Sequence, residues 1–175
     1  LKYYLLDERW NFREGEGIAG RLYNQMNKDY KKVLLAYSVL FSLHGTPINY
    51  FGDEIAMENN EEFYKKMTEK TGYKDSRYFN RGPFDEEKMH KALNDPKSDS
   101  YKVFNGIKEM LTIKRKNEGL FHIQPTYQNI NGIIKVTRQK ENKTLTIYNN
   151  LTKDTKTIEN ITLQPYQYKW QITKQ

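Results

Sequence analysis

The stretch Gly45-Thr46-Pro47-Ile48-Asn49-Tyr50-Phe51-Gly52-Asp53-Glu54 lies between a helical segment and a long polar region. Residues 46–51 are rich in β-prone side chains and predict a short strand. Residues 29–44 place apolar side chains at helical spacing, and that pattern stops at a glycine, a common end of a helix. We therefore expect a helix followed directly by a strand that ends in two carboxylates.

A second apolar run, residues 1–6, comes before this helix and also ends in acids, Asp7 and Glu8. It predicts a buried strand. The order strand, helix, strand, with acids at the exit of each strand, is typical of a parallel sheet or barrel. Two strands cannot close a barrel, so the pattern indicates part of a larger one.

In the rest of the chain, the spacing of apolar residues changes near Gly119. Residues 52–99 are mostly polar and predict a loop-rich insertion with one short helix over 61–70. Apolar spacing then predicts a helix from about 99 to 117, with one apolar face that carries Val103, Ile107, Met110 and Leu111. After Gly119 the period becomes two, as expected for antiparallel strands. These strands are expected at 132–137, 143–148, 154–158 and 166–172. The fold class is therefore α/β in residues 1–118 and all-β in residues 119–175.

Composition narrows the possible partners. The chain has 175 residues and a net charge of +7, but its lysines are mixed with acids, which favours a solvated basic surface over a nucleic-acid site. With no cysteine and three histidines, neither a thiolate nor a multi-histidine metal site is expected. No apolar run approaches the roughly 18 residues of a membrane span. We expect no cofactor, no nucleic acid and no membrane partner, and a cytoplasmic location.

The opening stretch resembles the strand-eight signature of the α-amylase superfamily, glycoside hydrolase family 13, in which the pattern is Gly-x-Pro-x-x-Tyr-x-Gly-Asp-Glu. Later segments are similar to amylosucrases, while trehalose synthases share the signature and match these segments less well. The amylosucrase-like segments are 74–83, 94–96, 103–110 and 161–167. The resemblance implies strand seven to helix eight of a TIM (β/α)8 barrel, followed by a small antiparallel β-sandwich domain.

The resemblance also implies a chemistry. Retaining glycosidases use two carboxyl groups about 5 Å apart, a nucleophile and an acid/base. In family 13 these lie on strands four and five, which this chain does not contain, so the chain alone is expected to be inactive. Its parent is expected to act on sucrose or α-glucans as a hydrolase or transglucosidase. The alternative is a non-catalytic structural or weakly glycan-binding module.

Four residues receive roles from the resemblance. Asp7 corresponds to the third, transition-state-stabilising carboxylate, although the histidine that normally precedes it is absent; alternatively, it is a structural acid at a strand end. Arg77 corresponds to a substrate-pocket arginine that pairs with an acid from an earlier part of the barrel, and without that acid it is expected to be unpaired. Asp53 and Glu54 are expected to be structural. The apolar runs predict self-association or docking with the missing part of the barrel.

Overall fold

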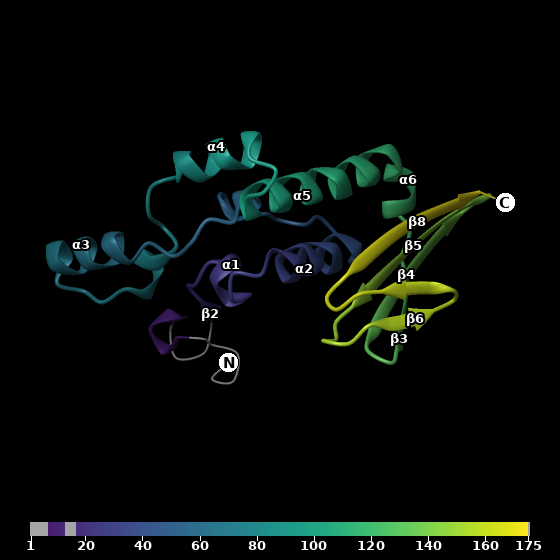
Figure 1. Ribbon diagram of the computed structural model, residues 1–175, viewed down its shortest axis with the longest axis horizontal. Helices are drawn as coiled ribbons and strands as arrows, with labels where there is room; N and C mark the ends of the chain where they lie inside the picture. The colour runs from purple at the N-terminus through teal and green to yellow at the C-terminus, as the bar shows by residue number, and fades with distance from the viewer. Residues whose placement is uncertain (1–6, 13–16, 175) are drawn as a thin grey trace. The chain divides into compact units, whose positions relative to one another are not determined.

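The computed structural model describes residues 7–12 and 17–174, which divide into two compact units (Figure 1). Unit 1 contains the described residues up to Tyr30 together with Asn49–Phe104, and unit 2 contains Lys31–Ile48 together with the described residues from Asn105 onward. The strand predicted over residues 1–6 lies outside the described residues. The predicted boundary at residue 118, between the barrel part and the antiparallel β-domain, stays a prediction.

Unit 1 is built from short helices and turns. Its one strand pair among the described residues is antiparallel, β1 (Asn11–Phe12) with β2 (Gly17–Ile18). The α-helices are α1 (Leu22–Gln25), α3 (Glu61–Thr71) and α4 (Glu86–Asn94). The 3-10 turns are η1 (Glu8–Trp10), η2 (Asp53–Ile55) and η3 (Ser76–Phe79).

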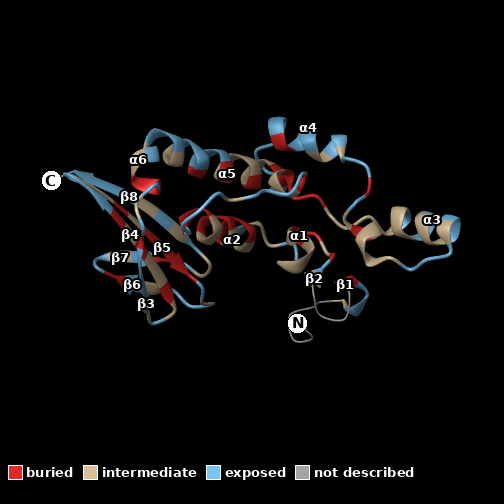
Figure 2. Ribbon diagram, turned by 180° about the vertical axis from the view of Figure 1, so that it is seen from behind, coloured by how far each residue is buried: buried red, intermediate tan, exposed pale blue. Residues whose placement is uncertain are grey.

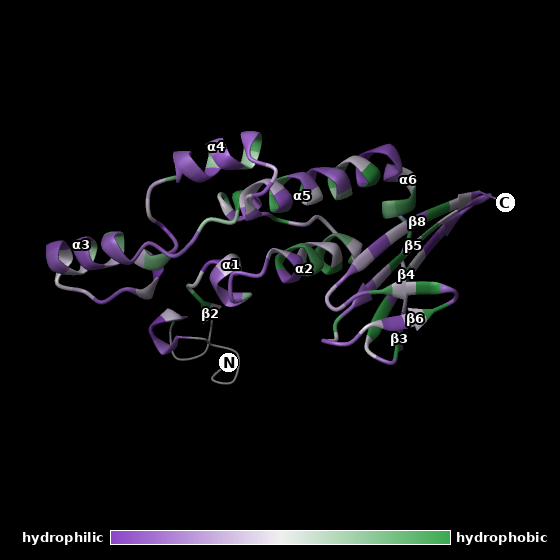
Figure 3. Cartoon of the chain, viewed as in Figure 1, coloured by the Kyte–Doolittle hydropathy of each residue, from purple (hydrophilic) through white to green (hydrophobic). Residues whose placement is uncertain are grey.

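The helices of the polar region are defined by their caps. The Asn60 side chain accepts a hydrogen bond from the backbone of Phe63 and starts α3, which ends at Gly72 with φ +74°. This helix confirms the one predicted over 61–70, and it is hydrophilic along most of its length (Figure 3). Helix α4 was not predicted. Its signal is the N-cap Asp85, which accepts a hydrogen bond from the backbone of Lys88.

Unit 2 contains three helices or parts of helices: α2 (Tyr30–Ser42), α5 (Asp99–Lys116) and α6 (Glu118–Phe121). The first residue of α2 and the residues of α5 up to Phe104 belong to unit 1. Four antiparallel strands follow in the spatial order β3-β4-β5-β8, and β6 and β7 form a separate antiparallel hairpin. Their bounds are β3 (Thr126–Ile130), β4 (Ile133–Lys140), β5 (Lys143–Asn150), β6 (Lys156–Ile158), β7 (Ile161–Leu163) and β8 (Tyr168–Lys174). The predicted antiparallel region is confirmed.

The four-stranded sheet buries apolar residues on both faces because side chains alternate along each strand. On one face, Val136 and its partner Ile147 pack with Leu120 and Phe121 of α6. On the other face, apolar residues pack beneath the β6–β7 hairpin; these are Ile133, Tyr148, Ile158 and Leu163. Helix α2 is also mostly buried (Figure 2). Its Ser38 hydroxyl donates to Asn149 of β5 at 2.6 Å and accepts from the Trp170 indole of β8 at 2.8 Å.

Two expectations are wrong in this structure. Residues 46–51, predicted as a strand, belong to no strand. A parallel strand needs a neighbouring strand to receive its backbone hydrogen bonds, and every pairing between described strands is antiparallel. Leu111, expected on the apolar face of α5, is 44% exposed, whereas Val103, Ile107 and Met110 are buried. Among the described residues, no helix is long and apolar enough to cross a membrane.

Candidate functional site

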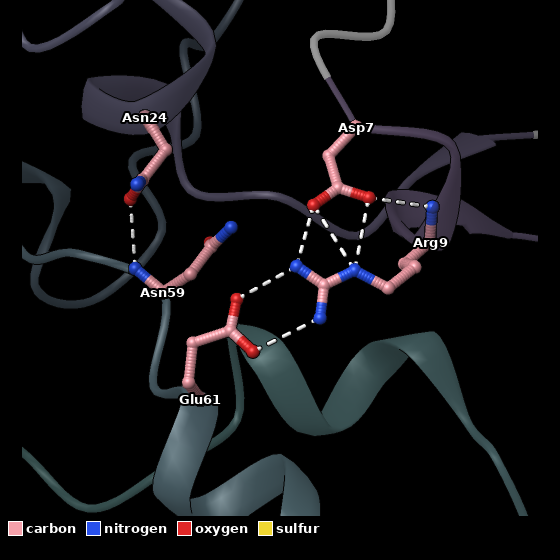
Figure 4. A network of polar contacts seen from close by, with 5 residues as sticks. All are labelled: Asp7, Arg9, Asn24, Asn59 and Glu61. Carbon is pink, nitrogen blue, oxygen red and sulfur yellow. Dashed lines mark hydrogen bonds and ion pairs between the residues drawn. The ribbon is translucent and has the colours of Figure 1, made fainter.

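Asp7, the predicted transition-state-stabilising carboxylate, starts the η1 turn. Its Oδ1 accepts the backbone N–H of Arg9 at 2.9 Å, a local turn that aspartate favours. The Arg9 guanidinium folds back onto the same carboxylate, with Nη2 2.6 Å from Oδ2. It also donates to both carboxylate oxygens of Glu61, at 3.0 and 3.1 Å (Figure 4). Arg9 therefore bridges two carboxylates from distant parts of the chain and lowers the pKa of Asp7.

The Asp7 carboxylate has few acceptor sites left for a ligand. A carboxylate offers about four lone-pair positions. Four hydrogen bonds from Arg9 are directed at its two oxygens, one from the backbone and three from the guanidinium. In this arrangement Asp7 forms a turn and an ion pair, and its equivalence to the family's third carboxylate stays a prediction.

Arg77 forms a second turn with the same Asp-x-Arg spacing. The Asp75 carboxylate caps η3 by accepting the backbone N–H of Arg77 at 2.9 Å. It also accepts from Arg77 Nη2 at 2.5 Å and from Nε at 2.9 and 3.0 Å. Hydrogen bonds from Arg77 lower the pKa of Asp75. The expectation of an unpaired Arg77 is therefore wrong, because a neighbouring acid in its own turn satisfies it.

The two turns also contact each other through aromatic rings. The Arg9 guanidinium lies over the ring of Phe79, 5.2 Å from its centroid, and the Arg77 guanidinium lies over the ring of Phe12 at 5.0 Å. Arg9 thus rests on the last residue of η3, and Arg77 rests on a residue that follows η1. Cation–π contacts of this kind favour arginine over lysine because the planar group stacks. The two predicted sugar-binding residues consequently belong to one interlocked pair of turns.

Asp53 and Glu54 lie beside a buried arginine that the sequence analysis did not single out. Arg21 is 2% exposed, and its Nη1 donates to the backbone carbonyl of Phe51 at 2.5 Å and to Asp53 at 3.4 Å. Burial raises the pKa of Asp53 to about 6, and Arg21 opposes this rise in the pKa. Glu54 accepts a hydrogen bond from Asn49 at 3.0 Å. These contacts are structural in kind, and the role assigned to the two acids stays a prediction.

Gly52 of the signature is required by geometry. Its φ is +86°, a left-handed conformation that favours glycine. A Cβ added there would lie 2.2 Å from the sulfur of Met57, whose backbone N–H donates to the Gly52 carbonyl at 2.9 Å. The turn after the signature is therefore closed too tightly for any side chain.

Asn59 connects this turn region to α1. Its backbone N–H donates to the Asn24 side chain at 2.7 Å (Figure 4), and its own side-chain oxygen accepts the backbone N–H of Arg21 at 2.7 Å. The roles of Arg9, Arg21 and Glu61 were not predicted from the sequence. The repeated Asp-x-Arg spacing could have indicated Arg9, but no local pattern indicates that Arg21 is buried or that Glu61 faces Arg9.

The described residues include no group of three or more histidine, cysteine, aspartate or glutamate side chains that could hold a metal ion. The arrangement in unit 1 consists instead of arginines held by carboxylates and aromatic rings. Chemically, such a cluster can position loops, and it can bind hydroxyl groups or anions where an arginine donor is released.

Comparison with known proteins shows which solved structures share the fold of this chain. No protein-family model matches the chain. Among solved structures, a cyclic α-maltosyl-(1→6)-maltose hydrolase from Arthrobacter globiformis aligns with 89% of this chain and 32% of its own, at 17% identity and a TM-score of 0.65. A family GH13_31 enzyme aligns with 89% of this chain and 39% of its own, at 16% identity and a TM-score of 0.64.

A sucrose 6F-phosphate phosphorylase from Thermoanaerobacter thermosaccharolyticum aligns with 84% of this chain and 28% of its own, at 17% identity and a TM-score of 0.60. The chain has the fold of part of these enzymes. It spans about a third of the length of the solved structures that it matches. At these identities the likeness shows the fold alone.

Proposed function

We propose that this chain is the C-terminal part of a retaining, α-glucoside-active enzyme of glycoside hydrolase family 13. One observation carries the proposal: 84–89% of the chain shares a fold with the three enzymes above, two of which have an α-glucoside in their names and the third of which is a GH13 enzyme. The stretch from Gly45 to Glu54, which resembles the strand-eight signature of that family, supports the same assignment independently of the fold.

The finer proposal is an amylosucrase-like parent that acts on sucrose or α-glucans. It is supported by the amylosucrase-like segments that run from residue 74 to residue 167. In this proposal Asp7 and Arg77 contact the sugar, while Asp53 and Glu54 hold the loops. Because the nucleophile and the acid/base are expected on barrel strands four and five, the 175-residue chain by itself does not catalyse the reaction.

A second candidate is a non-catalytic module from a degenerate family member. The observation that favours it is the state of the predicted sugar ligands: Asp7 is held by Arg9, and Arg77 is held by Asp75. A carboxylate and a guanidinium that satisfy each other locally are less available to a sugar. The two candidates differ in whether the rest of the barrel contributes the two catalytic carboxyl groups.

The test is the activity of the full-length protein that we propose contains this chain. Incubated with sucrose, it is expected to release fructose, and the 175-residue chain alone is expected to release none. Asp7→Asn is expected to lower kcat by about 10²-fold or more, as loss of a group that stabilises the transition state does. Glu8→Gln, a neighbouring exposed acid, serves as the matched control and should retain activity.

Three outcomes would count against these proposals. Cleavage of maltooligosaccharides without release of fructose would exclude the amylosucrase-like version and keep the family. No action on any α-glucoside would favour the non-catalytic module. Equal loss of activity in Asp7→Asn and Glu8→Gln would exclude a specific role for Asp7.

We further propose that the 175-residue chain covers its exposed apolar residues by self-association or by docking to the rest of the barrel. Ile48 is 85% exposed, and in unit 1 Tyr50 and Phe51 are more than 40% exposed. Exposed apolar surface of this kind marks interaction sites. Light scattering of the isolated chain is expected to show species larger than a monomer, which Ile48→Lys should reduce. A monodisperse wild-type monomer would contradict the proposal.

A further inference from the structure

A cavity of about 500 Å³ lies within unit 2, at the carboxyl ends of α2 and α5. Its walls come from the residues that follow α2, from the last turns of α5, and from α6. The apolar part is made by Pro47, Leu111 and Phe121, and the cationic part by Lys114 and Arg115. Cavities of this size with apolar walls and a few polar groups are typical of small-molecule sites.

Phe121 of the cavity wall contacts two cations, Lys114 of the wall and Arg138, which does not line the cavity. The Lys114 ammonium lies 4.7 Å from the centroid of the Phe121 ring, and the Arg138 guanidinium lies 5.1 Å from the same centroid. Arg138 is 1% exposed and donates to backbone carbonyls of Ser42, Leu43 and Ile123. One aromatic ring thus contacts two cations, and neither forms an ion pair with a carboxylate of the residues that the structure describes.

One acid, Glu118, lines the cavity, and its carboxylate lies 3.6 Å from the His122 ring. Across the described part of the chain, no carboxylate forms an ion pair with Lys114, Arg115 or Arg138. Burial, and then the charge of Arg138, lower the pKa of Lys114. Bringing an anion to this wall would offset both the desolvation and the like-charge repulsion.

We propose that this cavity is a binding site for an organic phosphate monoester, with the phosphate at Lys114 and Arg115 and the carbon body against Leu111 and Pro47. A dianion matches two adjacent cations better than a monoanion does. The apolar wall explains why Leu111, on an otherwise buried stripe of α5, is left 44% exposed. The inference does not depend on the proposed function, because all of these residues belong to unit 2.

Phenyl phosphate is a suitable probe, since it joins a dianionic group to an apolar ring. Titrated into the 175-residue chain and followed by calorimetry, it is expected to bind saturably with a Kd below about 1 mM. Lys114→Gln and Arg115→Gln are each expected to weaken binding about tenfold, the effect of losing one charge-assisted contact. Lys116→Gln is the matched control, because Lys116 is exposed on the same helix and is not part of the cavity wall.

Separate titrations test the contributions of the phosphate group and of the ring. Inorganic phosphate and phenol are each expected to bind more weakly than phenyl phosphate, and added salt should weaken phenyl phosphate binding. If Lys114→Gln lowers stability, Arg115→Gln decides the question, because Arg115 is exposed and not needed for packing. Absence of saturable binding, or equal weakening by Lys116→Gln, would overturn the proposal.

Discussion

Arg21→Met is expected to lower the free energy of unfolding of unit 1 by about 3 kcal/mol at neutral pH, which is typical of breaking a buried ion pair from one side. Methionine keeps most of the apolar stem but removes every donor. The Phe51 carbonyl then loses its partner, and the Asp53 carboxylate remains buried without a cation. Contacts of the guanidinium with the rings of Tyr50 and Phe51, both at 4.9 Å, are lost as well.

The pH dependence distinguishes this explanation from a simple loss of packing. Burial holds the pKa of Asp53 at about 6 in the folded protein, against an unfolded value of 3.8. A raised pKa means that the folded state binds the proton more tightly than the unfolded state does. Protonation of Asp53 therefore stabilises the fold fully below the pKa of the unfolded state, and this stabilisation is lost as the pH rises through the pKa of the folded state. Removing Arg21 should raise this pKa further, so the defect of Arg21→Met should shrink at acidic pH.

Urea unfolding followed by Trp10 fluorescence measures this effect, because Trp10 is buried in unit 1. A Trp170→Phe background removes the second indole. Adding Asp53→Asn to Arg21→Met should recover part of the lost stability, since no buried charge is then left. Arg81→Met, at an exposed arginine, should change stability by less than about 0.5 kcal/mol. An equal defect at neutral and acidic pH would refute the role given to Asp53.

Arg138→Met is expected to lower the free energy of unfolding of unit 2, also by about 3 kcal/mol, because hydrogen bonds from a charged group to three carbonyls disappear. Arg138 Nη2 lies 2.9 Å from the carbonyls of Ser42 and Leu43, and Nη1 contacts the carbonyl of Ile123. The Ser42 carbonyl belongs to the last residue of α2 and the Leu43 carbonyl follows it, and a cation at this end of the helix is favoured by the helix dipole. Methionine leaves the Ser42 carbonyl buried without a donor.

Trp170 reports on this change in a Trp10→Phe background, because it lies in β8 beside the core of unit 2. Arg138→Lys should have a smaller defect, since an ammonium keeps the charge but cannot span three carbonyls in a fixed plane. Lys140→Met, at an exposed position on the same strand, should be close to neutral. If lysine were as harmful as methionine, the charge would contribute nothing. If methionine were neutral, the carbonyl contacts would not matter.

The long elements could be predicted from the sequence, and most of the short ones could not. Helix α2 and helix α5 were expected within two residues of their observed ends, because apolar side chains repeat along them at helical spacing. Strands β4 and β5 were expected from alternation, again with small errors at their ends. Helix α4 is nine residues long and has one buried residue, so its periodic signal was too weak.

The candidate site was only partly predictable, for a related reason. Asp7 and Arg77 were named from a resemblance, but each is engaged by a residue two positions away in the chain. Such a turn is local and follows from the Asp-x-Arg spacing. The reciprocal contacts join Arg9 to Phe79, 70 positions away, and Arg77 to Phe12, 65 positions away. No local pattern encodes contacts between residues so far apart in the chain.

What the sequence determined by itself is therefore local: helical periodicity, strand alternation, the end of α2 shortly before Gly45, and turns that glycine or aspartate favours. Gly52 belongs to this group, because its left-handed backbone depends on having no side chain. Tertiary structure alone decided which charges are buried. Arg21 and Arg138 resemble ordinary surface residues in sequence, and their donors reach carbonyls 30 and 95 residues away. Burying a charge is tolerated only where such distant partners converge, so no short stretch of chain can specify it.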